Sequence, residues 1–220
     1  MRRRIMTSNK DIKTLLLLHG ETLADSSLYN RAMSIVNATV NSSQYKFTKS
    51  IYLNGSGIQL QTTSQPFNFS NKDFTIDFWL KLYSSSPGAN AILINMGTMN
   101  TWAYGYQITT DDSGKESIMF VFATAPSAIR IPISYYNAYS AWHHYAFVRK
   151  NTTMYAFLDG VLKNTLTSVG TIPDATVSHF SIGSHEAGTS PLKCYLDELR
   201  VSNVAQWTNN FDVPTKPYNI

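Results

Sequence analysis

Cysteine is nearly absent from this chain, because Cys194 is the only one among 220 residues. A single thiol forms no disulfide within the chain, and it rules out a zinc site built from several cysteines. We expect Cys194 to be a buried structural thiol of the core.

Long hydrophobic runs are missing as well. The apolar run from Leu15 to Leu18 is far too short to cross a bilayer. The arginines at positions 2–4 are followed by polar residues 7–11, where a secretory signal would carry an apolar segment. We therefore expect no membrane insertion and no signal peptide, and synthesis in a reducing cytoplasm.

Charge is sparse, at 15% of residues, and the formal net charge of +4 owes much to the arginines at positions 2–4. The rest of the chain is close to neutral, so it carries no electrostatic footprint for nucleic acid. A short basic start is typical of a flexible terminus. We expect residues 1–12 to be such a tail and residues 13–220 to form a single domain.

Carboxylate pairs suited to catalysis are scarce too. A glycoside hydrolase needs two carboxylates across a cleft, which on one strand requires that both side chains share a face. Asp197 and Glu198 are neighbours and point to opposite faces of a regular strand, and His143 and His144 diverge for the same reason. Serine-hydrolase and zinc-hydrolase motifs are absent. We therefore expect no enzyme activity, and a hydrogen-bonded core role for His144.

What the chain does contain favours β-structure, since aromatic residues make up 13% of it. The clearest strand is predicted at residues 74–82, where apolar even positions face the core and odd positions from Thr75 to Lys81 form a half-polar face. Further strands are expected at 14–18, 35–40, 50–53, 57–61, 91–96, 104–109, 117–123, 129–133, 142–149, 153–159, 161–166, 179–183 and 195–201. Their close spacing predicts an all-β sandwich or jelly roll.

Four stretches occur in an order that resembles one known family. They are residues 15–27 (Leu-Leu-Leu-Leu-His, a gap, then Asp-Ser-Ser), 50–57 (Ser-Ile-Tyr-Leu-Asn-Gly-Ser-Gly), 142–162 (Trp-His-His-Tyr-Ala-Phe-Val-Arg, then Tyr-Ala-Phe-Leu-Asp-Gly-Val-Leu) and 197–218 (Asp-Glu-Leu-Arg-Val-Ser-Asn-Val-Ala, later Pro-Thr and Pro-Tyr). Over residues 13–218 the chain resembles the laminin-G-like, concanavalin A-like jelly-roll domains common in phage tail and other virion-surface proteins.

The resemblance implies an all-β, antiparallel concanavalin A-like sandwich. Glycoside hydrolases share this sandwich, so the expectation of a function without catalysis rests on the missing carboxylate pairs and motifs. We expect a structural or interaction module on the surface of a phage virion, in a tail, a fibre or a capsid decoration, made in the host cytoplasm. It would dock through protein contacts with other virion proteins or with copies of itself. The alternative is a carbohydrate-binding adhesin that attaches the particle to glycans of the host or of its surroundings.

Two aromatic-rich stretches are candidates for ligand recognition, because tyrosine and tryptophan offer rigid, amphipathic contact area. The candidate residues are Trp102, Tyr104, Tyr106, Tyr135, Tyr136 and Tyr139. Three roles stay open for them: a sugar site, a protein interface, or packing at the ends of the sandwich.

The sequence requires no cofactor, but relatives in the family often hold a structural calcium ion through carboxylates and backbone carbonyls. By this resemblance Asp197 is a candidate calcium ligand, together with a group from loop 20–25. The family usually has an aromatic residue and Asp-Gly after the histidine, where this chain has Gly20-Glu21-Thr22. The alternative is that the acidic pair at this position binds Arg200 or Arg149 and backbone amides.

Overall fold

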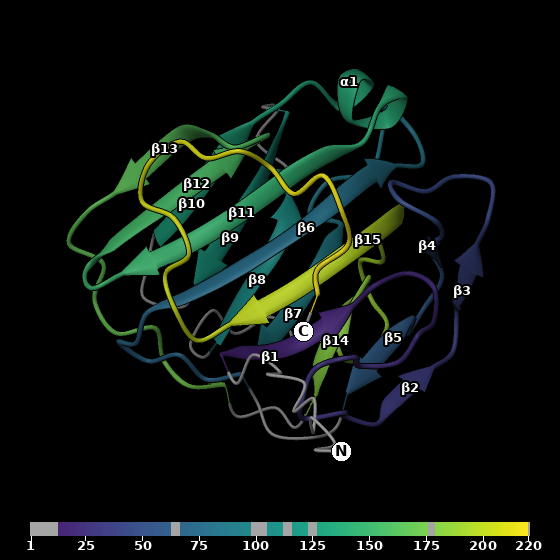
Figure 1. Cartoon of the computed structure of the whole chain (residues 1–220), viewed down its shortest axis with the longest axis horizontal. Helices are drawn as coiled ribbons and strands as arrows, with labels where there is room; N and C mark the ends of the chain where they lie inside the picture. The colour runs from purple at the N-terminus through teal and green to yellow at the C-terminus, as the bar shows by residue number, and fades with distance from the viewer. Residues whose placement is uncertain are drawn as a thin grey trace, which may run out of the picture.

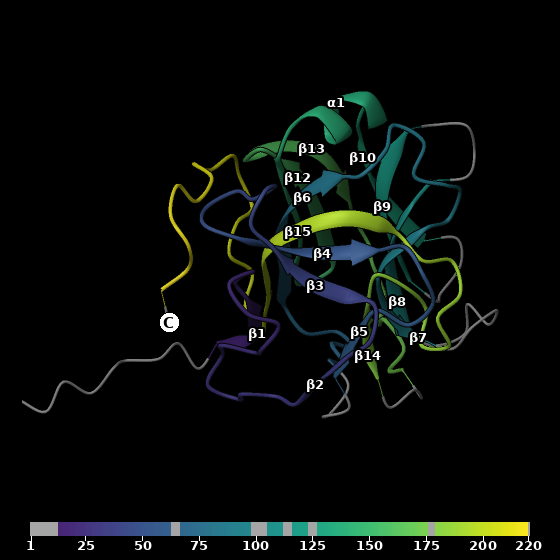
Figure 2. The same ribbon diagram turned by 90° about the vertical axis from the view of Figure 1, so that its right-hand side faces the viewer.

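The described part of the chain forms two antiparallel β-sheets that pack face to face, as the two views in Figures 1 and 2 show. The computed structural model describes residues 13–62, 67–97, 105–111, 116–122, 127–175 and 179–219. The expected all-β sandwich is confirmed. The expected tail, residues 1–12, lies outside the described residues, so that boundary stays a prediction.

The first sheet has eight strands. They are β1 (Thr14–Leu18), β3 (Ala38–Asn41), β4 (Ser50–Asn54), β6 (Phe74–Leu82), β11 (His143–Lys150), β12 (Thr153–Leu158), β13 (Val161–Leu166) and β15 (Lys193–Ser202). Their order is β13-β12-β11-β6-β15-β4-β3, and β1 pairs with β15 beside this path. The closing strand β15 therefore lies inside the sheet, between β6 and β4.

The second sheet has seven strands. They are β2 (Met33–Ile35), β5 (Leu60–Thr62), β7 (Ile92–Gly97), β8 (Gly105–Thr110), β9 (Ser117–Phe122), β10 (Ser127–Pro132) and β14 (Phe180–Ile182). Their order is β10-β9-β8-β7-β14-β5-β2. The helix α1 (Tyr135–Ser140) joins β10 to β11, and no helix in the described residues is long and apolar enough to span a bilayer.

The core lies between the sheets and is rich in aromatic side chains. The even positions of β6 from Phe74 to Leu80 are fully buried in it, as the alternation predicts. Phe120 of β9 stacks on Phe74 across the sandwich, with ring centroids 5.6 Å apart. Cys194 is a free, fully buried thiol, as expected, and burial raises the pKa of that thiol well above its usual value.

Residues 35–40 do not form the single strand that their composition predicts. The chain leaves β2 after Ile35 and enters β3 at Ala38, so the two short strands belong to different sheets. Between them the backbone N–H groups of Val36 and Asn37 both donate to the carbonyl oxygen of Gln59, at 3.0 and 3.3 Å. This crossover closes one side of the sandwich.

A β-bulge interrupts the alternation that the sequence shows along β15. Glu198 has a φ of 51°, and the pairing with β6 shifts between Asp197 and Arg200. One extra residue is thereby inserted, so Leu196 and Leu199 both face the core. A regular strand over residues 195–201 would place Asp197 and Leu199 on one face, and the bulge separates them.

The outer face of β6 is covered by residues 203–219, called here the C-terminal segment, which runs across the first sheet in Figures 1 and 2. Its side chains Trp207 and Phe211 stack on each other, with ring centroids 3.8 Å apart, and pack against a small buried cluster of Ala146, Val148 and Phe157. On β6 itself, the outward Thr75 and Asp77 are bonded to this segment and fully buried, so the strand is buried on both faces there.

Phe211→Ala tests how much this cover contributes to stability. The ring contacts Trp207, Phe157 and His144, the last two edge-on at centroid distances of 5.3 and 5.8 Å. Because Phe211 is half-buried, we expect the free energy of unfolding to fall by about 1–3 kcal/mol, measured by urea denaturation. The neighbouring exposed Asp212→Ala serves as control and should change it by less than about 0.5 kcal/mol. If both variants lowered the free energy of unfolding by the same amount, the packing of Phe211 on the sheet would not contribute to stability.

Candidate functional site

Three tyrosines gather on the outer face of the first sheet, beside the area that the C-terminal segment covers. Tyr52 lies on β4, Tyr195 lies on β15, and Tyr83 directly follows β6. Strand alternation turns Tyr195 outward, because its neighbours Cys194 and Leu196 are buried in the core. Tyr195 is paired with Tyr52 across the two strands, which brings their rings together.

The three rings form a compact cluster. The ring centroids of Tyr52 and Tyr195 are 5.2 Å apart, those of Tyr52 and Tyr83 are 6.0 Å apart, and those of Tyr83 and Tyr195 are 6.1 Å apart. Such distances are typical of favourable aromatic contacts. The cluster stays accessible at its rim, since Tyr83 is 41% exposed.

An open pocket of about 420 Å³ adjoins this cluster. It is lined by Gln44, Lys81, Leu82, Tyr83, Tyr139, Ser140 and Tyr195. We call this pocket, together with Tyr52, the tyrosine groove. Its volume lies within the range of about 300–1,000 Å³ typical of small-molecule sites. Aromatic faces next to hydroxyl, amide and ammonium groups suit a ligand that has both apolar faces and many hydroxyl groups, as a sugar has.

The helix α1 supplies the upper wall of the tyrosine groove. It buries Ala138 and presents Tyr139 and Ser140 to the pocket. Tyr135 anchors its start, because the Tyr135 hydroxyl donates to the carbonyl oxygen of Ser117 at 3.2 Å. The helix was not expected from the sequence, since its six residues are too few to show a helical period.

The structure separates the aromatic residues that the sequence grouped as ligand candidates. Tyr106 is only 2% exposed, stacks on Phe120 at 5.2 Å and donates its hydroxyl to the carbonyl oxygen of Phe67, so it is a core residue and not a surface contact. Tyr136 and Tyr139 are 65% and 43% exposed on α1. Trp102 and Tyr104 lie outside the described residues, and their role stays a prediction.

Sequence reasoning missed Tyr52, Tyr83 and Tyr195. Two of them occupy outward positions of strands that the sequence does predict, so alternation alone could have flagged them as surface aromatics. What alternation does not provide is the pairing of β15 with β4 and β6, strands that lie far away in the sequence. Only that pairing makes three isolated tyrosines into one surface.

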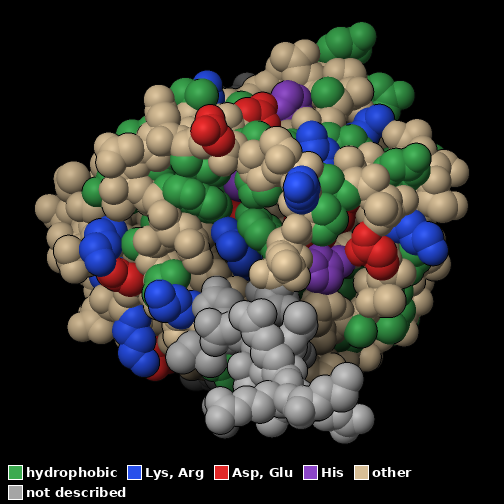
Figure 3. All heavy atoms as spheres, in the orientation of Figure 1, with side chains coloured by type: hydrophobic (Ala, Val, Ile, Leu, Met, Phe, Trp, Pro, Cys, Tyr) green, Lys and Arg blue, Asp and Glu red, His purple; other side chains and the backbone are tan. Residues whose placement is uncertain are grey.

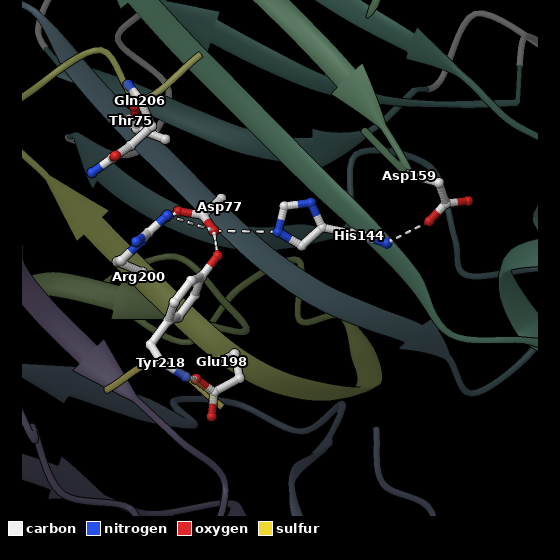
Figure 4. A network of polar contacts seen from close by, with 8 residues as sticks. All are labelled: Thr75, Asp77, His144, Asp159, Glu198, Arg200, Gln206 and Tyr218. Carbon is white, nitrogen blue, oxygen red and sulfur yellow. Dashed lines mark hydrogen bonds and ion pairs between the residues drawn. The ribbon is translucent and has the colours of Figure 1, made fainter. Parts of the chain in front are cut away.

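A buried carboxylate holds the covered part of the same face together, as Figure 4 shows. Asp77 of β6 is 0% exposed, accepts a hydrogen bond from Arg200 Nε at 2.9 Å and lies 3.2 Å from His144 Nε2. The hydroxyl of Tyr218, in the C-terminal segment, also donates to it. Burial acts to raise the pKa of Asp77, but Arg200 and His144 outweigh that effect and hold the pKa below its usual value. The expected core role of His144 is confirmed.

A second group of acids lies where the loop after β1 meets β15. Glu198 accepts the backbone N–H of Tyr218 at 2.7 Å and lies 2.7 Å from His19 Nδ1. Asp197 accepts the backbone N–H groups of Lys46 and Phe47, at 3.2 and 3.3 Å. Backbone amides therefore bind both acids, as the alternative to calcium predicted.

The arginines named in that alternative have other partners. Arg200 pairs with Asp77, and Arg149 donates to the backbone carbonyl oxygens of Ser70, Asn151, Val169 and Gly170. The predicted contact of Asp197 with an arginine is therefore replaced by contacts to backbone amides. Burial and the nearby Glu198 raise the pKa of Asp197 to about 7.

A group of possible metal ligands lies beside Asp197, and it combines a histidine nitrogen with the carboxylate oxygens that a hard cation prefers. One ligand atom each from His19, Glu21 and Glu198 lie within 4.8 Å of one another. Gly20 brings this loop against β4, because a side chain there would lie 2.6 Å from the carbonyl oxygen of Lys49 and 3.0 Å from Asp197 Oδ1, at a φ of 93°. Carboxylate oxygens and nearby carbonyls are the ligands that calcium prefers. Calcium binding at Asp197 stays a prediction.

The fold and these surfaces can now be compared with known proteins. The family model described as the concanavalin A-like lectin/glucanases superfamily matches residues 38–206, well over half of the chain. The chain belongs to this family. The resemblance read from the four sequence stretches is thereby confirmed. No curated protein matches the chain.

Solved structures with the same fold are binding domains of clostridial toxins. The binding domain of Paraclostridial Mosquitocidal Protein 1 is 16% identical with a TM-score of 0.68, over 89% of this chain and 50% of that one. The ligand binding domain of botulinum neurotoxin serotype D, in complex with N-acetylneuraminic acid, is 15% identical with a TM-score of 0.67, over 89% and 48%. The binding domain of botulinum neurotoxin DC, in complex with rat synaptotagmin II, is 17% identical with a TM-score of 0.64, over 89% and 49%.

This protein thus has a lectin-like fold and spans about half the length of those toxin domains. At such low identity the likeness establishes the fold alone. Those structures are themselves binding domains, and the expectation that this chain is not an enzyme stays a prediction. The ligands of those toxins are properties of those proteins.

The raised pKa of Asp197 makes a testable statement about pH. Between about pH 4, where an unfolded aspartate titrates, and about pH 7, the folded protein binds the extra proton, so stability from this group is lost as pH rises. His19, whose pKa is raised by its hydrogen bond to Glu198, acts in the same direction. We expect Asp197→Asn to remove about half or more of the decline in unfolding free energy between about pH 5 and pH 7.5.

The pH series is run by urea denaturation in EDTA, with the exposed Asp212→Asn as control. An unchanged slope in Asp197→Asn would show that this carboxyl does not carry the proton. Adding calcium to the wild type at about pH 7.5 should then raise its melting temperature, and the rise should be smaller in Asp197→Asn. A melting temperature that ignores calcium in both proteins would refute the calcium prediction while leaving the titration intact.

Proposed function

We propose that this protein is a non-catalytic carbohydrate-binding module that recognises glycans in the tyrosine groove. The observation that carries the proposal is the cluster of Tyr52, Tyr83 and Tyr195 beside an open pocket lined by amide, hydroxyl and ammonium groups. Sugars bind well on such surfaces, because the C–H face of a pyranose packs on an aromatic ring while its hydroxyls exchange hydrogen bonds.

The lectin-like fold and the glycan-bound state of one structural neighbour support this proposal. They favour a carbohydrate-binding adhesin over a purely structural module, which was the first expectation from the sequence. The setting we propose is the surface of a phage virion, where such a module would attach the particle to glycans. That setting rests on the sequence resemblance, and it is separable from the binding activity itself.

A glycan array probed with the full chain tests the proposal, once with calcium and once with a chelator. We expect binding to a chemically related set of glycans, weakened about tenfold or more, ~1.4 kcal/mol, in Tyr195→Ala and in Tyr83→Ala. Tyr29→Ala is the matched control, because Tyr29 is 50% exposed in the segment between β1 and β2. Tyr136→Ala, on α1, tells whether the exposed face of the helix takes part.

A blank array from well-folded wild-type protein would refute the proposal. Binding that survives in both groove variants, with melting temperatures unchanged, would refute the assignment of the site. Calcium dependence of binding would place the Asp197 region in the recognition event, whereas indifference to calcium would separate the two.

Protein docking is a second candidate function, and one observation favours it. The sandwich edge formed by β2 and β3 exposes Ile35, Val36 and Val40, at 49%, 58% and 39%. Apolar side chains on an exposed sheet edge are a template for pairing with another chain. We propose a second copy of this chain as the partner, in keeping with the self-association expected from the resemblance.

Val36→Lys tests this docking edge. If copies pair through it, the wild type should show a concentration-dependent dimer in analytical ultracentrifugation, and the charged variant should remain monomeric with a similar melting temperature. The exposed Val161→Lys on β13, at the opposite edge of its sheet, is the control. A wild type that stays monomeric at all concentrations would remove this candidate.

A further inference from the structure

Lysines alternate with tyrosines along the tyrosine groove. On β15, Lys193 and Tyr195 share the outward face. Across the strand, Tyr195 is paired with Lys81 of β6, and the backbone N–H of Tyr83 donates to the carbonyl oxygen of Lys193 at 3.3 Å. Tyr195 therefore has Lys81 as its cross-strand neighbour, and Tyr83 has Lys193.

Both ammonium groups have neutral partners. Lys81 Nζ donates to Gln44 Oε1 at 2.8 Å, and Lys193 Nζ lies 3.6 Å from the centroid of the Tyr83 ring. Among the described residues neither lysine forms an ion pair with a carboxylate. Lys150, by contrast, lies 2.7 Å from Asp73 Oδ2. The charge of Lys81 and Lys193 is thus available to a ligand.

The pocket wall adds no opposing charge. None of its seven lining residues is acidic, and the nearest outward carboxylate along β15, Asp197, is buried and bonded to the amides of Lys46 and Phe47. Figure 3 shows hydrophobic side chains and Lys or Arg side chains next to each other on the upper right of this face. A pocket that has Lys81 in its wall, Lys193 next to it on the Tyr83 ring, and no acidic lining residue attracts anions.

We infer that the tyrosine groove selects anionic glycans, whose carboxylate or sulfate group binds Lys81 and Lys193. This inference rests on the proposed function and names its ligand class. The tyrosine faces would hold the pyranose ring, while the ammonium groups, which act as compact point charges with three donors each, hold the anion. Because both lysines are partly solvent-accessible, the selection should weaken as salt screens the charges.

The test compares three matched probes: lactose, 3′-sialyllactose and 3′-sulfolactose, titrated calorimetrically into the full chain. We expect 3′-sialyllactose and 3′-sulfolactose to bind about tenfold or more tighter than lactose. This preference should shrink as the salt concentration rises from about 50 to about 500 mM. The two acidic probes separate carboxylate from sulfate recognition. Selection of either anion supports the inference.

Substitution of the lysines isolates their role. The double variant Lys81→Gln/Lys193→Gln should lose the preference for the acidic probes over lactose, measured as the ratio of the affinities within that variant, whatever its affinity for lactose itself. The double variant Lys81→Arg/Lys193→Arg should keep that preference, because the charge is retained. Lys163→Gln, an exposed lysine on β13, is the matched control and should change nothing.

The outcomes distinguish the inference from the function on which it rests. Equal affinity of the wild type for lactose and both acidic probes overturns the inference and leaves carbohydrate binding standing. A preference for the acidic probes that survives in Lys81→Gln/Lys193→Gln would also overturn the inference and leave carbohydrate binding standing. If the glycan array is blank as well as all three titrations, the proposed function falls and the inference falls with it.

Discussion

The first sheet depends on the contacts that the buried carboxylate of Asp77 makes with Arg200, His144 and Tyr218. This carboxylate has no access to solvent, so its charge must be balanced from within, and it takes its partners from β11, β15 and the C-terminal segment. Removing one member of such a buried set leaves an uncompensated charge and typically costs about 3–5 kcal/mol. One strand side chain therefore ties the last residues of the chain to its centre.

That same arrangement divides the outer face into two parts. Where the C-terminal segment lies over the sheet, Trp207 and Phe211 exclude solvent and the face becomes a second, small core. Beyond it, the strands carry Tyr52, Tyr195 and Lys81 to an accessible surface. The position of the tyrosine groove thus depends on where the C-terminal segment stops covering the sheet, as well as on the side chains that form the groove.

The sequence predicts the sandwich well and the site poorly, for one physical reason. Alternation along a single strand is local, so the core face of β6 follows directly from it, whereas His144 lies on the outer face and is buried by Trp207 and Phe211. Pairing between distant strands is non-local, and a single bulged residue such as Glu198 reverses every side chain beyond it. The ligand candidates were sought in two contiguous aromatic-rich stretches, whereas half of the tyrosine groove comes from strands that pair across long sequence distances.

Because half of the side chains of the tyrosine groove, including Tyr52 and Tyr195, lie on paired strands, the ladder of backbone hydrogen bonds holds their positions. A ligand would find the rings already in place, with little loop ordering to slow its arrival. Recognition of this kind is kinetically fast and is tuned mainly through the dissociation rate. Exchange of single side chains at the outward positions of β4 and β15 would then change the ligand without disturbing the fold, which gives the module a simple route to new specificities.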